Sequence, residues 1–348
     1  VLIEEPEAHL HAQVQQVFIK EAYKVLRNNV NLGNKKSFTT QLVISTHSNH
    51  IAHEIDFTSL RYFKRGSSIA GSIATSTVVN LSKTFGDETD TTKFAKRYLK
   101  TTHCDLFFAD AVIMVEGPAE KMLVPYFIKK YSKLNSCYLS ILEIGGSHAH
   151  TLKPLIENLG IITLVISDID AINPKANNSK VQPEKGKGYL SGNDTLKKWL
   201  PEESSLDKLL ILLEKEKNHK SLPIKIAYQI PINIMDGKKA ITIYPYTFED
   251  CIVMENREIF QKITGAKGLL KKMVDAALEK DIPKAATMMY DAITEKGAKK
   301  AEFALELLYM EEPTILTTPA YINEGLKWLE TQLLANKQGF STVTSTKK

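Results

Sequence analysis

Two acids close the most strand-like run of the sequence. Asp168 and Asp170 follow Ile161–Ser167, an apolar run that is rich in β-branched residues and predicts a buried strand. Because side chains alternate along an extended chain, both carboxylates point to the same side. Like charges held together in a turn favour a divalent cation with oxygen ligands, most often Mg²⁺ or Mn²⁺. Two solvated acids on a surface turn are the alternative.

A second pair of acids follows another predicted buried strand, Ala111–Val115. Glu116 ends this strand, Pro118 suits the first turn of the next helix, and Glu120 lies one turn into that helix. Ligands of open α/β sheets collect at the carboxyl ends of the strands. We therefore expect both carboxylates at such an edge, where a cation would offset their repulsion. Acids that decorate a solvated turn are the alternative.

A third acidic cluster ends the strand that is predicted over Ala240–Tyr246. Its acids are Glu249 and Asp250, and Asp250 could instead cap the helix that is predicted from Cys251 onward. Each of these three acidic clusters therefore follows a predicted strand.

The N-terminal stretch predicts a separate strand–helix–strand unit, and therefore a parallel pair of strands. Val1–Ile3 and Gln41–Ser45 are short apolar runs, and Ala12–Val25 between them has apolar residues at helical spacing. Acidic and imidazole side chains follow these two runs: Glu4, Glu5 and His47.

The composition is that of an ordinary soluble globular protein, with 348 residues, 43% hydrophobic and 24% charged. This length predicts about two or three domains. The net charge of +5 permits a polyanionic partner without requiring one. The three cysteines lie far apart, which fits a reduced cytoplasmic compartment and disfavours a structural zinc site. No apolar run approaches the ~20 residues that span a bilayer, so we expect no membrane contact.

The N-terminal stretch resembles the second half of an ABC-type ATPase head, in the branch that includes the Rad50-like and OLD (overcoming lysogenization defect) proteins. The resemblance implies that Glu4 holds magnesium through water, that Glu5 polarises the attacking water and that His47 faces the γ-phosphate. A capping or core role is the alternative for His47. Because the sequence contains neither G-x-x-x-x-G-K-[ST] nor an LSGG-like signature, we expect a missing upstream part. Only the complete ATPase domain would then use ATP.

The later motifs resemble a Toprim domain of the OLD type, Gabija-type defence relatives included. VEGPAE and SDIDA lie roughly fifty residues apart, Gly145-Gly146 between them predicts a tight turn, and the ATPase-like stretch precedes them. The resemblance covers nearly the whole chain. It implies that Glu249, with Asp250 as second choice, completes a second metal site. It also implies that Lys300, in a K-x-x-F-A stretch, stabilises developing negative charge, with Lys299 or a plain surface lysine as the alternatives.

We therefore predict an α/β fold class: the C-terminal half of an ABC ATPase sheet, then a Toprim parallel α/β sheet with a helical insertion and C-terminal helices. The expected divisions are residues 1–85 for the ATPase part, 86–104 for a linker, 105–255 for the Toprim domain with an insertion over 173–235, 256–340 for a helical region, and 341–348 for a tail.

The function that we expect is a metal-dependent DNA endonuclease in phage defence or DNA repair, with two Mg²⁺ or Mn²⁺ ions ~3.5–4 Å apart. The expected catalytic residues are Glu116, Asp168 and Lys300. The expected metal ligands are Glu116, Glu120, Asp168, Asp170, Glu249 and Asp250. The alternative is a non-cleaving, ATP-regulated module with a Toprim fold that binds DNA or a protein partner.

Basic residues outside the acid clusters are candidates for contact with DNA phosphates. They are Lys185, Lys187, Lys96 and Arg97. A solvated surface is the alternative for each of these stretches. We also expect a homodimer or higher homo-oligomer, since ABC heads generally pair, and a helicase-like partner remains open.

Overall fold

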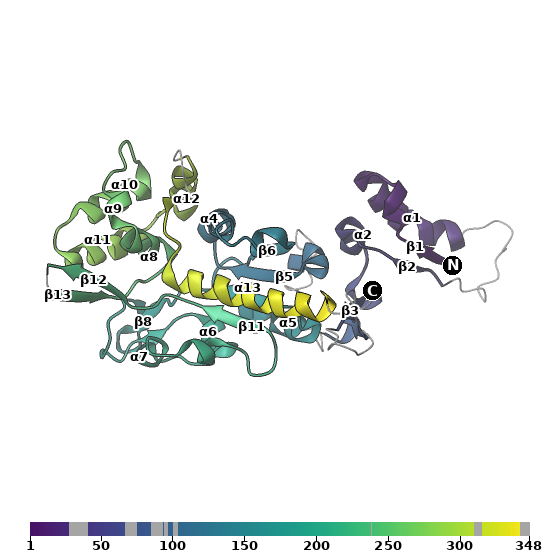
Figure 1. Cartoon of the computed structure of the whole chain (residues 1–348), viewed down its shortest axis with the longest axis horizontal. Coiled ribbons are helices and arrows are strands. Elements are labelled where there is room, and N and C mark those ends of the chain that lie inside the picture. The colour runs from purple at the N-terminus through teal and green to yellow at the C-terminus, as the bar shows by residue number, and fades with distance from the viewer. Residues whose placement is uncertain are drawn as a thin grey trace, which may run out of the picture. The chain divides into compact units, whose positions relative to one another are not determined.

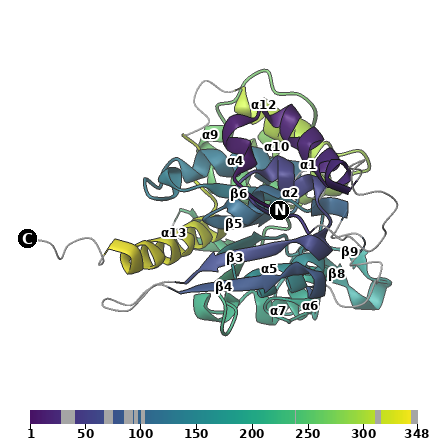
Figure 2. The same cartoon turned by 90° about the vertical axis from the view of Figure 1, so that its right-hand side faces the viewer.

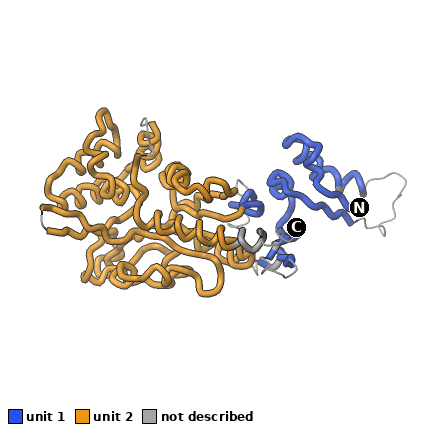
Figure 3. The backbone as a smooth tube through the Cα atoms, in the orientation of Figure 1, with its two compact units in different colours: residues 1–109 blue, residues 110–348 orange. Residues whose placement is uncertain are grey.

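The computed structural model describes residues 1–27, 41–66, 75–84, 93, 97–99, 104–237, 239–309 and 315–341. It divides the chain into two units, Val1–Ala109 and Asp110–Lys348 (Figure 3). Most of the expected linker, including Lys96, and most of the expected tail lie outside the described residues.

The first unit contains the predicted parallel strand pair. Strand β1 (Leu2–Glu4) pairs in parallel with β2 (Val43–Ser45), and α1 (Ala12–Arg27) lies between them in the sequence. Ser48 caps α2 (Asn49–Glu54) because its hydroxyl accepts the Ile51 N–H. The alternating runs LRYF and SIATSTVVN predict either edge strands or a hairpin. In the structure β3 (Arg61–Arg65) and β4 (Ser76–Asn80) are antiparallel neighbours (Figure 2).

The second unit is built on a parallel sheet of four strands in the order β11-β7-β5-β6. Every residue of β5 and β7 is buried, as expected for central strands that are covered on both faces. The predicted α/β fold class is confirmed. The strands of this sheet are β5 (Ala111–Val115), β6 (Leu139–Glu143), β7 (Thr163–Ile166) and β11 (Ile224–Ala227).

Helices cover this sheet. Helix α4 (Pro118–Ile128) packs on β6, and the long helix α13 (Ala320–Ser341) packs along β7 and β11 (Figure 1). Gly325 makes that approach possible, because a Cβ there would lie 2.8 Å from Leu164 Cδ1. Helix α5 (Lys153–Leu159) connects β6 to β7 and ends at Gly160 in the left-handed conformation.

The fourth strand of the sheet was not predicted. We expected the chain to return from its insertion with a strand over Ala240–Tyr246. Instead β13 (Lys239–Ile243) pairs antiparallel with β12 (Ile232–Asp236), and β11 lies beside β7. Strand β11 was missed because it is short and contains Lys225, whose buried ammonium group pairs with Glu214 Oε2 at 2.6 Å. A core strand therefore lies inside the stretch that we expected to be an insertion.

Two stretches with apolar residues at helical spacing form shorter helices than that spacing predicts. A helix is expected over Leu206–Glu216, but α7 ends at Leu209. A helix is also expected over Ile259–Lys272, but α9 ends at Phe260 and α10 begins at Gly268, because Gly265 and Gly268 both have positive φ. The remaining strands and helices are β8 (Ala171–Asn173), β9 (Ser179–Lys180), β10 (Leu190–Ser191), α6 (Asp194–Lys198), α7 (Leu206–Leu209), α8 (Phe248–Glu255), α9 (Arg257–Phe260), α10 (Gly268–Leu278), α11 (Ile282–Thr294) and α12 (Lys300–Leu308).

Helices α8 to α12 gather with the β12–β13 hairpin at one end of the second unit (Figure 1). Short 3₁₀ segments complete the described structure, at Pro6–His9, Phe57–Ser59, Leu81–Lys83, Cys104–Phe108, Leu134–Ser136, Ala149–Leu152, Pro174–Ala176 and Glu214–Lys217. Among the helices that the structure describes, none has both the length and the apolar character needed to cross a bilayer.

Candidate metal centre

The carboxyl ends of β5 and β7 bring the first acids together. The two strands are neighbours, so Glu116 after β5 and Asp168 after β7 leave the sheet at the same edge. Helix α4 adds Glu120, and α8 adds Glu249. These four side chains are buried. Lys300, the first residue of α12, is the cation beside them. The Gly145-Gly146 turn after β6 borders this edge, because the Gly146 N–H donates to the Glu116 carbonyl oxygen at 2.9 Å.

Two polar side chains fix the Glu116 carboxylate. Asn193 Nδ2 donates to its Oε1 at 2.5 Å, and Ser167 Oγ donates to the same oxygen. The Asn193 amide oxygen also accepts the Thr195 N–H and so caps α6. Burial, and next the charge of Asp170, raises the pKa of Glu116 to about 7, although these hydrogen bonds oppose the shift.

Asp168 is held by groups from β11 and α8. Gln229 Nε2, just after β11, donates to Asp168 Oδ1 at 2.6 Å, and the Phe248 N–H at the start of α8 donates to the same oxygen at 3.1 Å. The Gln229 side-chain oxygen accepts the Ile169 N–H at 2.8 Å, which fixes the turn itself. Burial raises the pKa of Asp168 well above its usual value. Sequence reasoning missed Asn193, Ser167 and Gln229.

Lys300 joins two of the acids. Its ammonium group lies 2.8 Å from Glu249 Oε2 and 3.8 Å from Asp168 Oδ2. Burial favours a lower pKa for Lys300, but Glu249, Asp168 and Glu120 together raise it well above its usual value. Burial, followed by the charge of Glu249, raises the pKa of Glu120 to about 8. This lysine therefore stays charged, while Glu120 and Asp168 beside it are reluctant to ionise.

Asp170 and Asp250 differ from the other acids. Asp170 is half-buried and has a left-handed backbone conformation, with φ of 45°. Asp250 accepts three backbone N–H groups, from Tyr246 at 2.6 Å, Thr247 at 2.8 Å and Cys251 at 3.1 Å. Its carboxylate therefore caps α8, which was the alternative role considered for it. Burial nevertheless raises the pKa of Asp250 to about 6.

One buried tyrosine lies close to the acids. Tyr246 is 2% exposed, and burial, followed by the charge of Asp170, raises the pKa of its phenol. A side-chain hydrogen bond with Tyr246 in turn opposes the rise that burial causes in the pKa of Asp170.

The donor set fits a hard divalent cation. Every candidate ligand is a carboxylate oxygen, as Mg²⁺ and Mn²⁺ prefer, and burial with mutual repulsion makes the acids costly to ionise without a cation. Within the described residues, however, no three acid, histidine or cysteine side chains converge closely enough to hold an ion as they stand. Cation binding would therefore need side-chain rotation inside the cluster.

The three N-terminal candidates also lie at strand ends. Glu4 ends β1, and Glu5 follows it in a left-handed conformation with φ of 42°. His47 follows β2, and its Nε2 lies 3.2 Å from Glu5 Oε1. The His47 N–H donates to Glu7 Oε1 at 2.5 Å. Because β1 and β2 are parallel neighbours, the predicted acid and imidazole meet at one edge. All three side chains are exposed.

The candidate DNA-contacting residues lie on the surface. Lys185 and Lys187 are exposed on the loop between β9 and β10, where Lys187 pairs with Glu184 at 3.3 Å. Arg97 is exposed, and Lys96 lies outside the described residues.

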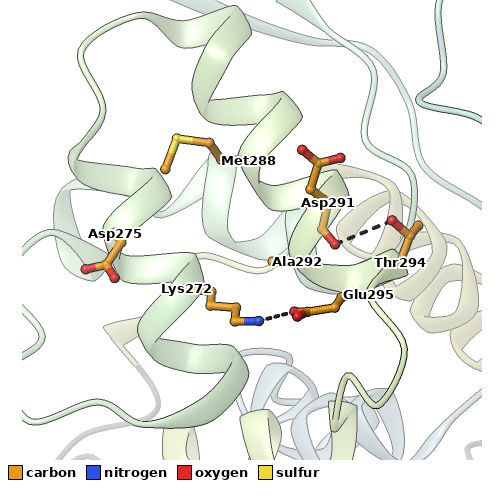
Figure 4. A pocket seen from close by; sticks show the side chains of 7 residues that line it. All are labelled: Lys272, Asp275, Met288, Asp291, Ala292, Thr294 and Glu295. Atoms are coloured by element: carbon orange, nitrogen blue, oxygen red, sulfur yellow. Dashed lines mark hydrogen bonds and ion pairs between the residues drawn. The ribbon is translucent and has the colours of Figure 1, made fainter.

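A separate pocket opens between α10 and α11 (Figure 4). Its charged lining residues are three acids and one lysine, and Lys272 pairs there with Glu295. None of the predicted site residues contributes to it. The pocket is lined by Lys272, Asp275, Met288, Asp291, Ala292, Thr294 and Glu295.

Comparison with protein families gives two matches. Residues 1–52 match the model of an AAA ATPase domain. Residues 107–170 match the model described as the overcoming lysogenization defect protein-like TOPRIM domain. The chain is thus similar to OLD-like proteins over this domain. The matched stretch includes β5, β6 and β7 with Glu116, Glu120, Asp168 and Asp170.

Two curated relatives of this chain are each named Endonuclease GajA. The chain is 32% identical over 363 residues to that of Bacillus cereus (strain HuB5-5), covering 96% of this chain and 48% of the relative. It is 27% identical over 177 residues to that of Bacillus cereus (strain VD045), covering 50% of this chain and 27% of the relative. The chain thus spans about half the length of the first of these proteins.

A solved structure with similarity to the chain is the C-terminal region of the Burkholderia pseudomallei OLD protein. The TM-score is 0.35 at 17% sequence identity, and the match covers 65% of this chain and 99% of that one.

Proposed function

We propose that this chain is part of a metal-dependent DNA endonuclease. The observation that carries the proposal is the cluster of buried carboxylates at the carboxyl edge of the parallel sheet, with the Lys300 ammonium group between Glu249 and Asp168. Burying so many acids destabilises a fold unless a cation is to be bound there. Both curated relatives carry the name of an endonuclease, which supports the same reaction class.

The cations would be Mg²⁺ or Mn²⁺, held by Glu116, Glu120, Asp168, Asp170 and Glu249. When bound, two such ions lower the pKa of a water for attack on phosphorus and neutralise charge on the leaving oxygen. Asp250 is left out of this ligand set because backbone N–H groups occupy its carboxylate.

The chain's own residues orient these ligands. Asn193 and Ser167 hold the Glu116 carboxylate at the end of β5, and Gln229 holds Asp168. Fixed ligands reduce the reorganisation needed during the reaction. Lys300 places a permanent positive charge beside the acids, where it would stabilise charge that develops on the phosphate. No nucleophilic side chain is required, because water attacks phosphorus.

The partner would be DNA, contacted chiefly through its phosphates by Lys185, Lys187, Lys96 and Arg97. Such binding weakens steeply as salt concentration rises.

The N-terminal unit would form part of an ATP-binding head in which Glu4, Glu5 and His47 act on the nucleotide. We further propose that the complete protein is a homo-oligomer and that the divisions expected above separate its ATPase, Toprim and helical parts.

Nicking of a supercoiled plasmid in Mn²⁺, with and without a chelator, tests this function. Asp168→Ala and Glu116→Ala should each abolish the open-circle product that the wild-type chain forms. Glu143→Gln is the matched control, because Glu143 ends β6 at the same sheet edge but is half-buried and pairs with Lys121 at 3.6 Å. It should nick as the wild type does. Unchanged nicking by both alanine variants would contradict the assignment.

The same assay separates the alternative function. If the wild-type chain binds DNA but forms no chelator-sensitive product, a non-cleaving module with a Toprim fold is the better description. Folding of every variant should be checked by its far-UV circular dichroism, so that loss of activity is not loss of structure.

A further inference from the structure

The Gln229 side chain uses all of its polar groups at the edge of the sheet. Its amide nitrogen donates to Asp168 Oδ1 at 2.6 Å and to the Tyr321 hydroxyl oxygen at 3.3 Å. Its amide oxygen accepts the Ile169 N–H at 2.8 Å. The reverse orientation would set the amide oxygen against the Asp168 carboxylate and the amide nitrogen against the Ile169 N–H. The neighbours of Gln229 therefore allow one orientation of this amide.

Tyr321 reaches the amide from the first turn of α13, 92 positions beyond Gln229 in the sequence. The residue is 1% exposed, and burial raises the pKa of its phenol well above the usual value, so the hydroxyl is neutral. Helix α13 is fixed where it begins, because the Ala320 N–H donates to both carboxylate oxygens of Glu255 at 2.9 Å. The helix then packs along β11 (Figure 1). The docking of α13 thus sets the position of the Tyr321 hydroxyl.

The two carboxylate oxygens of Asp168 have different surroundings. Oδ1 accepts from the Gln229 amide at 2.6 Å and from the Phe248 N–H at 3.1 Å. Oδ2 lies 3.8 Å from the Lys300 ammonium group. A carboxylate oxygen that already accepts two N–H groups has both lone pairs in use. Oδ2 is therefore the oxygen that remains for a cation.

We propose, resting on the metal-dependent function above, that Tyr321 is a positioning residue of the metal centre, which acts through Gln229 to hold Asp168 with Oδ2 directed to the cation. A ligand that is oriented in advance needs less reorganisation when the ion binds, and outer hydrogen bonds of this kind raise metal affinity. In this role Tyr321 touches neither the cation nor the DNA. Helix α13 becomes part of the metal centre although it supplies none of the candidate ligands.

Titration calorimetry with Mn²⁺ tests the proposal. Gln229→Met keeps the length of the side chain but removes the amide. It should bind Mn²⁺ about tenfold or more weakly than the wild type, because outer hydrogen bonds to metal ligands are worth about 10–100-fold in affinity. Tyr321→Phe removes only the hydroxyl and should bind Mn²⁺ about 2–10-fold more weakly, the factor that corresponds to one neutral hydrogen bond.

The double variant shows whether Tyr321 acts through Gln229. Once the amide is absent, the Tyr321 hydroxyl no longer has it to orient. Gln229→Met combined with Tyr321→Phe should therefore bind Mn²⁺ as weakly as Gln229→Met alone. Two losses that multiply would overturn the proposal, because Tyr321 would then act independently of Gln229.

Tyr228→Phe is the matched control. Tyr228 directly precedes Gln229 and is also fully buried, but its hydroxyl donates to the Leu209 carbonyl oxygen at 2.9 Å. Removing that bond should lower the melting temperature in chelator and leave Mn²⁺ affinity unchanged. If Tyr228→Phe lost as much affinity as Tyr321→Phe, the effect would belong to any buried hydroxyl and the role of Tyr321 would be wrong.

Thermal melting in chelator separates folding from binding. If Gln229→Met shows no cooperative transition, the comparison of Tyr321→Phe with Tyr228→Phe decides the question. Equal Mn²⁺ affinity of the wild type and Tyr321→Phe would overturn the role of Tyr321 and leave the metal-dependent function intact. A wild-type chain that binds no Mn²⁺ would refute the metal centre itself.

Discussion

Glu120 offers the most direct test of the energetics of the cluster, because it is 4% exposed and lies among other acids. Burial and the charge of Glu249 raise its pKa from 4.5 to about 8. The folded state therefore binds this proton more tightly than the unfolded state. The resulting stabilisation is complete below pH 4.5 and is lost as the pH rises through about 8. Glu120→Gln, which cannot ionise, should remove this pH dependence from the metal-free protein.

The size of the effect follows from the two pKa values. Ionisation of Glu120 lowers the free energy of unfolding by about 1 kcal/mol near pH 5 and by about 4 kcal/mol near pH 8. These figures are upper limits, because neighbouring acids share the proton. The glutamine variant should thus exceed the wild type near pH 8 by up to about 8–16 °C in melting temperature.

Thermal or urea unfolding in chelator, at about pH 5 and about pH 8, measures this difference. Glu258→Gln is the control, because Glu258 is an exposed glutamate on α9, and it should follow the wild type at both pH values. Adding Mn²⁺ should stabilise the wild type more than Glu120→Gln, because the variant has a neutral amide in place of the carboxylate that would bind the ion. If Glu120→Gln and the wild type lose stability equally between the two pH values, the cost ascribed to burying this carboxylate is wrong.

Two further substitutions probe the groups around the acids. Lys300→Met should lower nicking ~100-fold or more and destabilise the fold by about 2 kcal/mol, because the buried Glu249 side chain would lose its ion-pair partner. Lys299→Met should leave nicking unchanged, since Lys299 pairs with Glu302 at the surface. Equal losses for both lysine variants would contradict the role of Lys300. Asn193→Ala should lower the free energy of unfolding, measured in urea, by about 2–4 kcal/mol, because the substitution removes both the α6 cap and a hydrogen-bond donor to Glu116. A stability equal to that of the wild type would show that neither hydrogen bond stabilises the fold.

The acids of the candidate site could be found from the sequence because their positions are set locally. A central parallel strand is buried on both faces and must be a continuous apolar run, as Ala111–Val115 and Thr163–Ile166 are. The residue that follows such a run lies at the edge of the sheet. This reasoning placed Glu116 and Asp168 at the ends of buried strands, and the resemblance to OLD proteins supplied the order of the motifs. The structure then showed that β5 and β7 are neighbours.

The groups that orient those acids could not be found in the same way, because they come from distant parts of the chain. Asn193 is 77 positions from Glu116, and Gln229 is 61 positions from Asp168. Strand β11, which brings Gln229 to the edge, was hidden because its buried Lys225 depends on Glu214 elsewhere. No local pattern distinguishes these amides from surface residues.

The sequence by itself determined the α/β class, the central strands and which acids end them, because apolar runs and breaks are properties of neighbouring residues. Tertiary structure alone decided the rest. It placed the Asp250 carboxylate on the backbone N–H groups at the start of α8, and it brought Glu249 to within 2.8 Å of Lys300. Such choices depend on which atoms lie within about 3 Å of one another after folding, a distance that spacing along the chain does not specify.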